Sequence, residues 1–311
     1  MAWTTDMLVA AVKRKAQAPT VGWQLTDTDV LTIAFEETTK RFIPAIRAVR
    51  QDFYTTFATI PLVANTASYR LPLRASSTTI KQVLLVQTST GWAVPVPRLP
   101  ASQGWSGLGR QSNTPYAYVI EGAQLRLLAT PQNVSQYQLR VYYQRRPSNY
   151  VPVSSCSVVA STTATTIVLT APPAWWSTGE LVDVMSPEPE SDLVMQDVGV
   201  TLGGSTFTIT SGASTAQVVA GNYVAERDTT CVILLPDAFI HALIDATTAE
   251  CLRSTGDYDA ASSLEANMES TLPGVLASIA ERVEAQPQPI RNNNAGLLQS
   301  GRLRGGWGWG Q

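Results

Sequence analysis

His241 is the natural starting point in a search for chemistry, because it is the only histidine in the chain. General acid–base catalysis near neutral pH most often uses histidine. His241 lies beside Ile240 in a stretch with helical periodicity, and no Gly-x-Ser-x-Gly sequence supplies the nucleophile of a Ser–His–acid triad. A lone histidine on an amphipathic helix is usually structural. We therefore expect no catalytic residue in this chain and no enzyme activity.

Two other stretches contain residue types that bind ions. The run "SPEPESD" carries Glu188, Glu190 and Asp192, which are calcium-binding types, but its prolines favour an extended solvated loop. The glycine-rich "GWSGLGR" at 104–110 is not followed by the Lys-Ser/Thr pair of a phosphate-binding loop. The sequence therefore predicts no metal site and no cofactor.

The last eleven residues, "GRLRGGWGWGQ", combine five glycines with two arginines and two tryptophans. Such a glycine-rich segment costs too much entropy to form a helix or a strand. Arg302, Arg304, Trp307 and Trp309, with Arg291 upstream, instead suit a flexible arm that inserts anchors into a partner. Arg and Trp also stack on single-stranded nucleic acid, so a nucleic-acid-binding module is the alternative. A terminus without function is the third interpretation.

Composition favours a structural subunit. Hydrophobic residues make up 44% of the 311 residues, whereas charged residues make up only 15% and the net charge is −2. A weakly polar surface is cheap to desolvate, which suits a subunit buried against neighbours. No global positive field attracts nucleic acid or an anionic membrane. The three cysteines are widely spaced without a CxxC pair, so we expect buried free thiols. No membrane span or signal peptide is indicated, and we expect a soluble chain made in the cytoplasm.

Helical periodicity occurs near both ends of the chain. Residues 4–17 predict a short helix capped by Thr4 or Thr5. The next helix starts near Thr26 or Asp27 and continues past Pro44, where we expect a kink. Helix returns at "LPDAFIHALIDATTAECLRSTGD", with Gly256 as its C-terminal cap, and again at "DYDAASSLEANMESTLPGVLASIAERVEA", which Pro273 is expected to bend or split.

The middle of the chain alternates with a period of two, which is typical of β-strands. The stretch "YTTFATIPLVANTASYRLPL" predicts a hairpin around Asn65, "TIKQVLLVQ" a buried strand and "GWAVPVPRLP" an edge strand. The stretch "YAYVIEGAQLRLLA" predicts a hairpin around Glu121-Gly122, followed by the strand "YQLRVYYQRRP". Short β-type runs separated by Gly, Pro and Ser then predict a small all-β module.

These elements predict an α+β fold in which a helical bundle of the N- and C-terminal helices carries inserted antiparallel β structure and a small all-β module. The expected divisions are residues 1–53 plus 232–286 for the helical bundle, 54–150 for a β-rich hairpin region, 151–231 for an inserted small β-barrel or sandwich, and 287–311 for an extended C-terminal arm. We expect the inserted module to face outward.

The order of these elements resembles a known family. A long N-terminal helix precedes a Tyr-x-Leu-Pro turn formed by Tyr69, Leu71 and Pro72, and a later strand carries the pair Tyr142 and Tyr143. Helices opening on "LPDAFIHALIDATTAECL" and continuing with "GDYDAASSLEANMES" follow. This order is similar to that of the adaptor (head-to-tail connector, or head-completion) proteins of short-tailed bacteriophages. The resemblance covers most of residues 25–285.

The resemblance implies a structural virion protein at the head–tail junction. In that family a homo-oligomeric ring, commonly a homododecamer, binds beneath the portal protein and receives the tail or nozzle protein. DNA passes through the ring channel during ejection without sequence recognition. The resemblance further implies that the C-terminal arm docks on portal subunits, and no membrane is involved. A tail-tube or baseplate subunit is a further alternative, which does not explain helices at both ends.

Overall fold

A computed structural model of the chain describes residues 3–17, 24–75, 78–100, 102, 111–112, 115–132, 134, 136–176, 181–187, 193–210 and 215–279. These all belong to one compact unit, Met1–Ile279. The predicted arm at 287–311, the acidic run at 188–192 and the glycine-rich run at 104–110 lie outside the described residues.

The N-terminal helices begin at capping residues that the sequence predicts. Helix α1 spans Thr5–Lys15, and the hydroxyl of Thr4 accepts a hydrogen bond from the backbone N–H of Met7. Helix α2 spans Asp27–Glu37, and its first turn is closed by a capping box in which Thr26 and Asp29 each accept a bond from the other's backbone N–H. Both caps satisfy N–H groups that have no partner within the helix.

Pro44 does interrupt the second helix, through a change of helix type. A π-helical turn, Thr38–Phe42, follows α2 directly, and helix α3, Ile43–Val49, starts just before Pro44. Because proline has no backbone N–H, it cannot donate to the carbonyl of the preceding turn. The wider turn before it lies where the regular hydrogen-bond pattern would fail.

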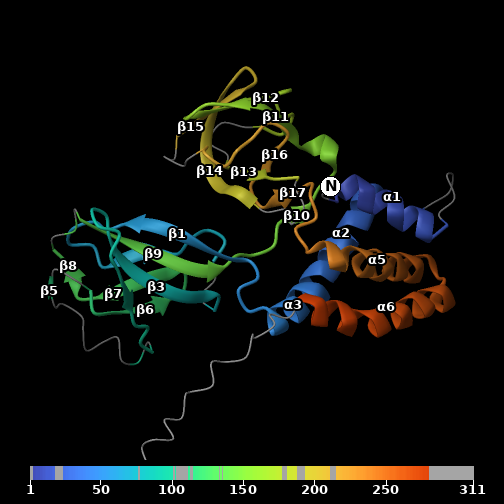
Figure 1. The fold of residues 1–311 in the computed structure, drawn as a ribbon, viewed down its shortest axis with the longest axis horizontal. Helices are drawn as coiled ribbons and strands as arrows, with labels where there is room; N and C mark the ends of the chain where they lie inside the picture. Colours follow the sequence, from blue (N-terminus) through green and yellow to red (C-terminus); the bar gives the residue numbers. More distant parts are fainter. Residues whose placement is uncertain are drawn as a thin grey trace, which may run out of the picture. The chain divides into compact units, whose positions relative to one another are not determined.

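The two C-terminal helices follow each other closely in the chain and pack together. A short 3-10 turn, Asp237–Phe239, leads into α5, Ile240–Thr255, which ends at Gly256 with a φ of 93°. This left-handed conformation is the predicted cap. Helix α6 spans Tyr258–Ile279 with Pro273 inside it, so of the two expected effects of Pro273, a bend or a split, the split does not occur. Helices α1 and α2 pack on α5, and α3 packs on α6 (Figure 1).

The first β region contains two main sheets. The four-stranded sheet has the order β1-β9-β3-β4, and the three-stranded sheet has the order β2-β7-β6. Their strands are β1 Thr55–Pro61, β2 Ser68–Arg70, β3 Ile80–Gln87, β4 Ala93–Val96, β6 Ala117–Glu121, β7 Gln124–Leu128 and β9 Tyr137–Gln144. Two short strands, β5 Gln111–Ser112 and β8 Thr130–Pro131, pair with each other. The β6–β7 hairpin around Gly122 and the edge position of β4 confirm the predictions for these strands.

The predicted hairpin around Asn65 is wrong. Strand β1 pairs along its length with β9, whereas β2 pairs with β7, so the two strands do not pair with each other. Alternation identifies each strand but carries no information about its partner. Asn65, with a φ of 61°, lies instead in a loop that connects two different sheets.

The second β region is a closed six-stranded barrel with the order β11-β12-β15-β14-β13-β16 (Figure 1). Its strands are β11 Ser157–Thr162, β12 Thr166–Leu169, β13 Leu181–Met185, β14 Leu193–Gly203, β15 Thr206–Ile209 and β16 Tyr223–Glu226. Apolar side chains on the inward face, among them Ile167, Val182 and Phe207, are fully buried. Short parallel strands β10, Asn149–Tyr150, and β17, Thr229–Thr230, connect the barrel to the rest of the chain, and a 3-10 turn at Val153–Ser155 precedes β11.

The expected fold class, an α+β fold built on a helical bundle, is wrong. Strand accounts for 34% of the structure and helix for 33%, and the fold includes a six-stranded barrel rather than a helical-bundle core. The helices share one hydrophobic cluster, but the sheets and the barrel each bury a cluster of their own. The helical spacing of apolar residues showed that each helix must pack its apolar face against another element. It did not show that the alternating strands would build separate hydrophobic cores of their own.

Candidate functional site

The Tyr-x-Leu-Pro stretch forms a locked turn at the end of β2. The hydroxyl of Tyr69 accepts the backbone N–H of Val63 at 3.0 Å and lies 3.0 Å from the carbonyl oxygen of Thr66, to which it donates. Leu71 is buried, and its backbone N–H donates to the carbonyl of Ala123 at 2.9 Å. The carbonyl of Pro72 then accepts the N–H of Ala75 at 2.9 Å. This turn fixes the direction of the side chain that directly precedes Ala75.

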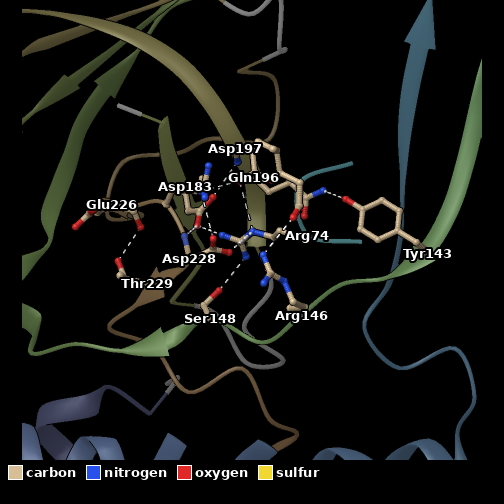
Figure 2. Close-up of polar contacts among 12 residues, drawn as sticks. Arg74, Tyr143, Arg146, Ser148, Asp183, Gln196, Asp197, Glu226, Asp228 and Thr229 are labelled. Atoms are coloured by element: carbon tan, nitrogen blue, oxygen red, sulfur yellow. Dashed lines mark hydrogen bonds and ion pairs between the residues drawn. The ribbon is translucent and has the colours of Figure 1, made fainter. Parts of the chain in front are cut away.

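That side chain is Arg74, which is completely buried and reaches the barrel (Figure 2). Its Nη2 binds Oδ2 of Asp183, and its Nη1 donates to Oγ of Ser148 at 3.0 Å. Its Nε lies 3.1 Å from Oδ1 of Asp228 and 3.6 Å from Oδ1 of Asp197. We call these five residues, Arg74, Ser148, Asp183, Asp197 and Asp228, the Arg74 cluster.

A β-bulge in the barrel positions the acidic side of the cluster. On β13, Val182 pairs with Val198 and Val184 pairs with Met195 of β14, so Asp183 alone faces two residues of β14. Such a bulge turns side chains out of the regular alternation. The two residues are Gln196 and Asp197, and Asp197 has a φ of 52°. Asp183 Oδ1 accepts the backbone N–H of Asp197 at 2.9 Å.

The third carboxylate comes from the turn between β16 and β17. Asp228 has a φ of 65°, and its backbone N–H donates to Asp183 Oδ2 at 2.9 Å. Its carbonyl accepts the N–H of Asn149 at 2.7 Å, next to Ser148. Asp183 therefore accepts from the guanidinium of Arg74 and from two backbone N–H groups, and the cluster joins five separate chain segments.

Burial dominates the electrostatics of the Arg74 cluster. It raises the pKa of Asp183 to about 6, although Arg74 and the two backbone N–H groups lower it. Burial also raises the pKa of Asp197, again against the lowering effect of Arg74. Arg227 adds a second positive charge at the edge, 3.2 Å from Asp228. An arginine thus fills the space between the carboxylates, and the arrangement links the Leu71–Ala75 turn to the barrel rather than offering a reaction site.

The paired tyrosines of β9 divide between the two faces of their sheet. Tyr143 is buried, its hydroxyl accepts Nε2 of Gln196 at 2.6 Å, and burial raises its pKa (Figure 2). Tyr142 faces the other way and packs against Phe57 with ring centroids 5.6 Å apart. Because Gln196 is one of the two bulge residues, Tyr143 makes a second contact between the sheet and the same part of the barrel.

Sequence reasoning missed Arg74 and its three carboxylates. One signal for Asp183 was present: it stands inside the apolar strand "ELVDVM", where a charged residue needs a buried partner. No local pattern marks Arg74, Asp197 or Asp228. The predicted docking residues Arg291, Arg302, Arg304, Trp307 and Trp309 lie outside the described residues.

His241 is exposed on α5, and its ring meets Trp3 edge-on with centroids 6.5 Å apart. A pocket of about 540 Å³ lies elsewhere, next to the end of α6. Its arginines are engaged, because Arg50 binds Asp52 at 3.1 Å and Arg145 lies over the Tyr54 ring at 5.0 Å. Within the described ranges, no group of three or more His, Cys, Asp or Glu side chains is placed to hold a metal ion. None of the described helices combines the length and apolarity needed to cross a membrane.

Comparison with sequence models of protein families identifies a family for this chain. The sequence model of the SU10 adaptor protein family matches residues 4–179, which is more than half of the chain. The matched range includes the N-terminal helices, both sheets, Arg74 and the first strands of the barrel. None of the curated proteins matches the chain.

Proposed function

Because this chain belongs to the SU10 adaptor protein family, we propose that it forms a ring between the portal and the tail of a phage virion. Membership of the family supports a structural adaptor role in the virion. In the proposal, about twelve copies form the ring, as is common for adaptors of short-tailed phages, and the ring channel carries DNA without reading its sequence. The observation that carries this proposal is the family match over residues 4–179.

The composition of the chain supports assembly into a ring. Charged residues make up only 15% of the sequence, and the two signs nearly balance. Contacts between copies therefore desolvate few charges. A chain with net charge −2 also has no strong attraction for the DNA phosphates that pass through a channel.

The Arg74 cluster supports the role of a rigid spacer. An adaptor has different neighbours on different faces, so its parts need a fixed orientation. Arg74 binds the Leu71–Ala75 turn to Asp183 of the barrel. The hydrogen bond between Gln196 and Tyr143 adds a second contact. In the proposal, the inserted module at 151–231 presents an outward surface to the tail or to a neighbouring subunit.

We further propose that the arm at 287–311 attaches the ring to the portal. Trp307 and Trp309 each bury on the order of 200 Å² when they enter a pocket. At about 25 cal/mol per Å², each contributes about 5 kcal/mol before the cost of ordering the glycines. Arg302 and Arg304 fix the register by pairing with acidic side chains or carbonyls. Repetition around a ring converts a small surplus per arm into strong attachment.

Electron microscopy of the purified protein mixed with its portal protein tests the ring. The expected result is closed rings with cyclic symmetry stacked coaxially on the portal. Open filaments, or a monomer that does not bind the portal, would contradict the proposal.

Removal of residues 301–311 tests the arm. The truncated protein is expected to keep its circular dichroism spectrum and to lose attachment to the portal. The matched control is Trp92→Ala, which removes an exposed tryptophan from the β3–β4 connection and should leave attachment intact. Attachment at wild-type strength after truncation would refute the role of the arm, whether or not rings form.

The nucleic-acid alternative makes a different prediction for the same truncation. If the arm binds single strands, the full-length protein is retained on single-stranded DNA at low salt and released as salt is raised, because its arginines displace counterions. The truncated protein then loses this retention while its attachment to the portal is unchanged.

A further inference from the structure

Two of the three cysteines stand at the two places where the chain enters and leaves the barrel. Cys156 directly precedes β11, and Cys231 directly follows β17. The entering and leaving segments lie side by side, because β10 and β17 pair in parallel and the N–H of Val151 donates to the carbonyl of Thr230 at 2.9 Å.

The two thiols lie near each other. Cys156 packs against the hydrophobic cluster that contains Cys231, and it is close enough to affect the pKa of Cys231. Both are free thiols. Both backbones are held: the N–H of Cys156 donates to the carbonyl of Val153 at 3.0 Å, and the carbonyl of Cys231 accepts the N–H of Thr5 at 2.9 Å. Two anchored thiols that lie near each other meet the first requirement for a disulfide.

The two cysteines differ in access to solvent. Cys231 is completely buried, whereas Cys156 is half-buried. Interaction with Cys156, followed by burial, raises the pKa of Cys231, and the nearby Asp6 acts in the same direction. Cys231 therefore keeps its proton at neutral pH, and Cys156 is the thiol that an oxidant reaches first.

We propose that Cys156 and Cys231 form a disulfide when the chain moves from a reducing cytoplasm to an oxidising medium. The oxidant is a small disulfide of the glutathione class. The Cys156 thiolate attacks it, one S–S bond breaks and a small thiol leaves. The thiolate of Cys231, released from its proton to water, then attacks the Cys156 sulfur and expels the second small thiol. Overall, two protein thiols are oxidised and one small disulfide is reduced to two thiols.

A virion component makes this change of environment when it is released from its host, because cytosolic thiols stay reduced and extracellular ones are oxidised. The inference therefore rests on the virion location and is independent of the ring, the channel and the arm. The bond would close a loop of about 75 residues that contains the whole barrel, and it would hold the entering and leaving segments together.

Treatment of the full-length protein with oxidised glutathione tests the proposal. The background is Cys251→Ser, since Cys251 is buried in a different cluster and burial raises its pKa to about 12. Peptide mass spectrometry without reductant is expected to find a Cys156–Cys231 cross-link. The melting temperature is expected to rise by about 5–10 °C and to return after reduction.

The matched control adds Cys156→Ser to the same background. It keeps Cys231 and should show neither the cross-link nor the shift. Two results would overturn the proposal: glutathione that stays attached to Cys156 without an internal bond, or a cross-link that leaves the melting temperature unchanged. Because the purified subunit suffices, failure of ring assembly does not affect the outcome.

Discussion

Replacing Arg74 with methionine is the sharpest test of the Arg74 cluster. Methionine keeps most of the buried volume but removes the guanidinium that neutralises Asp183, Asp197 and Asp228. Removing one partner of a buried ion pair typically costs about 3–5 kcal/mol, because the remaining charge is left without compensation. We expect Arg74→Met to lower the free energy of unfolding by this amount at pH 8.

The pH dependence of this loss distinguishes an electrostatic effect from a packing defect. In the wild type, the pKa of Asp183 is about 6 in the folded state against 3.8 as a reference, so the folded state binds the proton more tightly. This difference corresponds to about 3 kcal/mol of stability, which is present below pH 3.8 and lost as the pH rises through 6.

Without Arg74, which lowers this pKa, the folded-state pKa of Asp183 lies higher still. The variant therefore begins to recover stability at a higher pH than the wild type does as the solution is acidified. At pH 5 the carboxyl of Asp183 is protonated in both proteins. The difference between them should then shrink to about 1–2 kcal/mol, the cost of the lost hydrogen bonds.

Urea unfolding at pH 8 and pH 5 measures both quantities, and hydrogen exchange at Asp197 and Asp228 reports the cluster directly, because both amides donate to Asp183. The matched control is Arg70→Met, which changes an exposed arginine on β2 and should alter stability by less than about 0.5 kcal/mol. A loss for Arg74→Met that is equal at both pH values would refute the electrostatic explanation and leave only packing.

Two further substitutions test local features of the fold. Tyr69→Phe removes the hydroxyl that holds the loop before β2, and it should cost about 1–2 kcal/mol and speed hydrogen exchange at Val63; unchanged exchange there would contradict the assigned bond. Gly256→Ala should cost about 1 kcal/mol in thermal or urea unfolding, because a φ of 93° strains any residue with a Cβ although no atom lies within 4 Å of that position. Gly274→Ala inside α6 is its control and should be neutral or stabilising, so a similar loss at both positions would rule out backbone strain as the cause.

Local signals in the sequence predict local features well. The caps Thr4 and Thr26 were each one of two neighbouring candidates, and Gly256 was identified directly, because capping depends on residues within one turn. The hairpin around Gly122 was identifiable for the same reason. The strands of the barrel were visible as short alternating runs that predicted a small barrel or sandwich. The choice between these two was left open, because closure depends on pairing between segments far apart in the chain.

Long-range pairing also explains the errors. Strands do form on both sides of Asn65, but β1 pairs with β9 and β2 pairs with β7. No residue near Asn65 indicates which strands will pair. Arg74 was hidden in the same way. Its guanidinium meets carboxylates from β13, β14 and the β16–β17 turn, which are brought together only after the barrel has formed.

The Arg74 cluster also explains why a buried charge is useful in such a subunit. An apolar contact between the Leu71–Ala75 turn and the barrel would be at least as stable, because charges lose hydration when they are buried. It would also tolerate sliding, since apolar contacts have no preferred direction. A guanidinium has donors in a fixed plane, and here its two terminal nitrogens donate to Asp183 and Ser148, while Nε lies 3.1 Å from Asp228 without a hydrogen bond. The two directed hydrogen bonds restrict the orientation of the turn. A subunit that must hold different neighbours on different faces gains from that restriction.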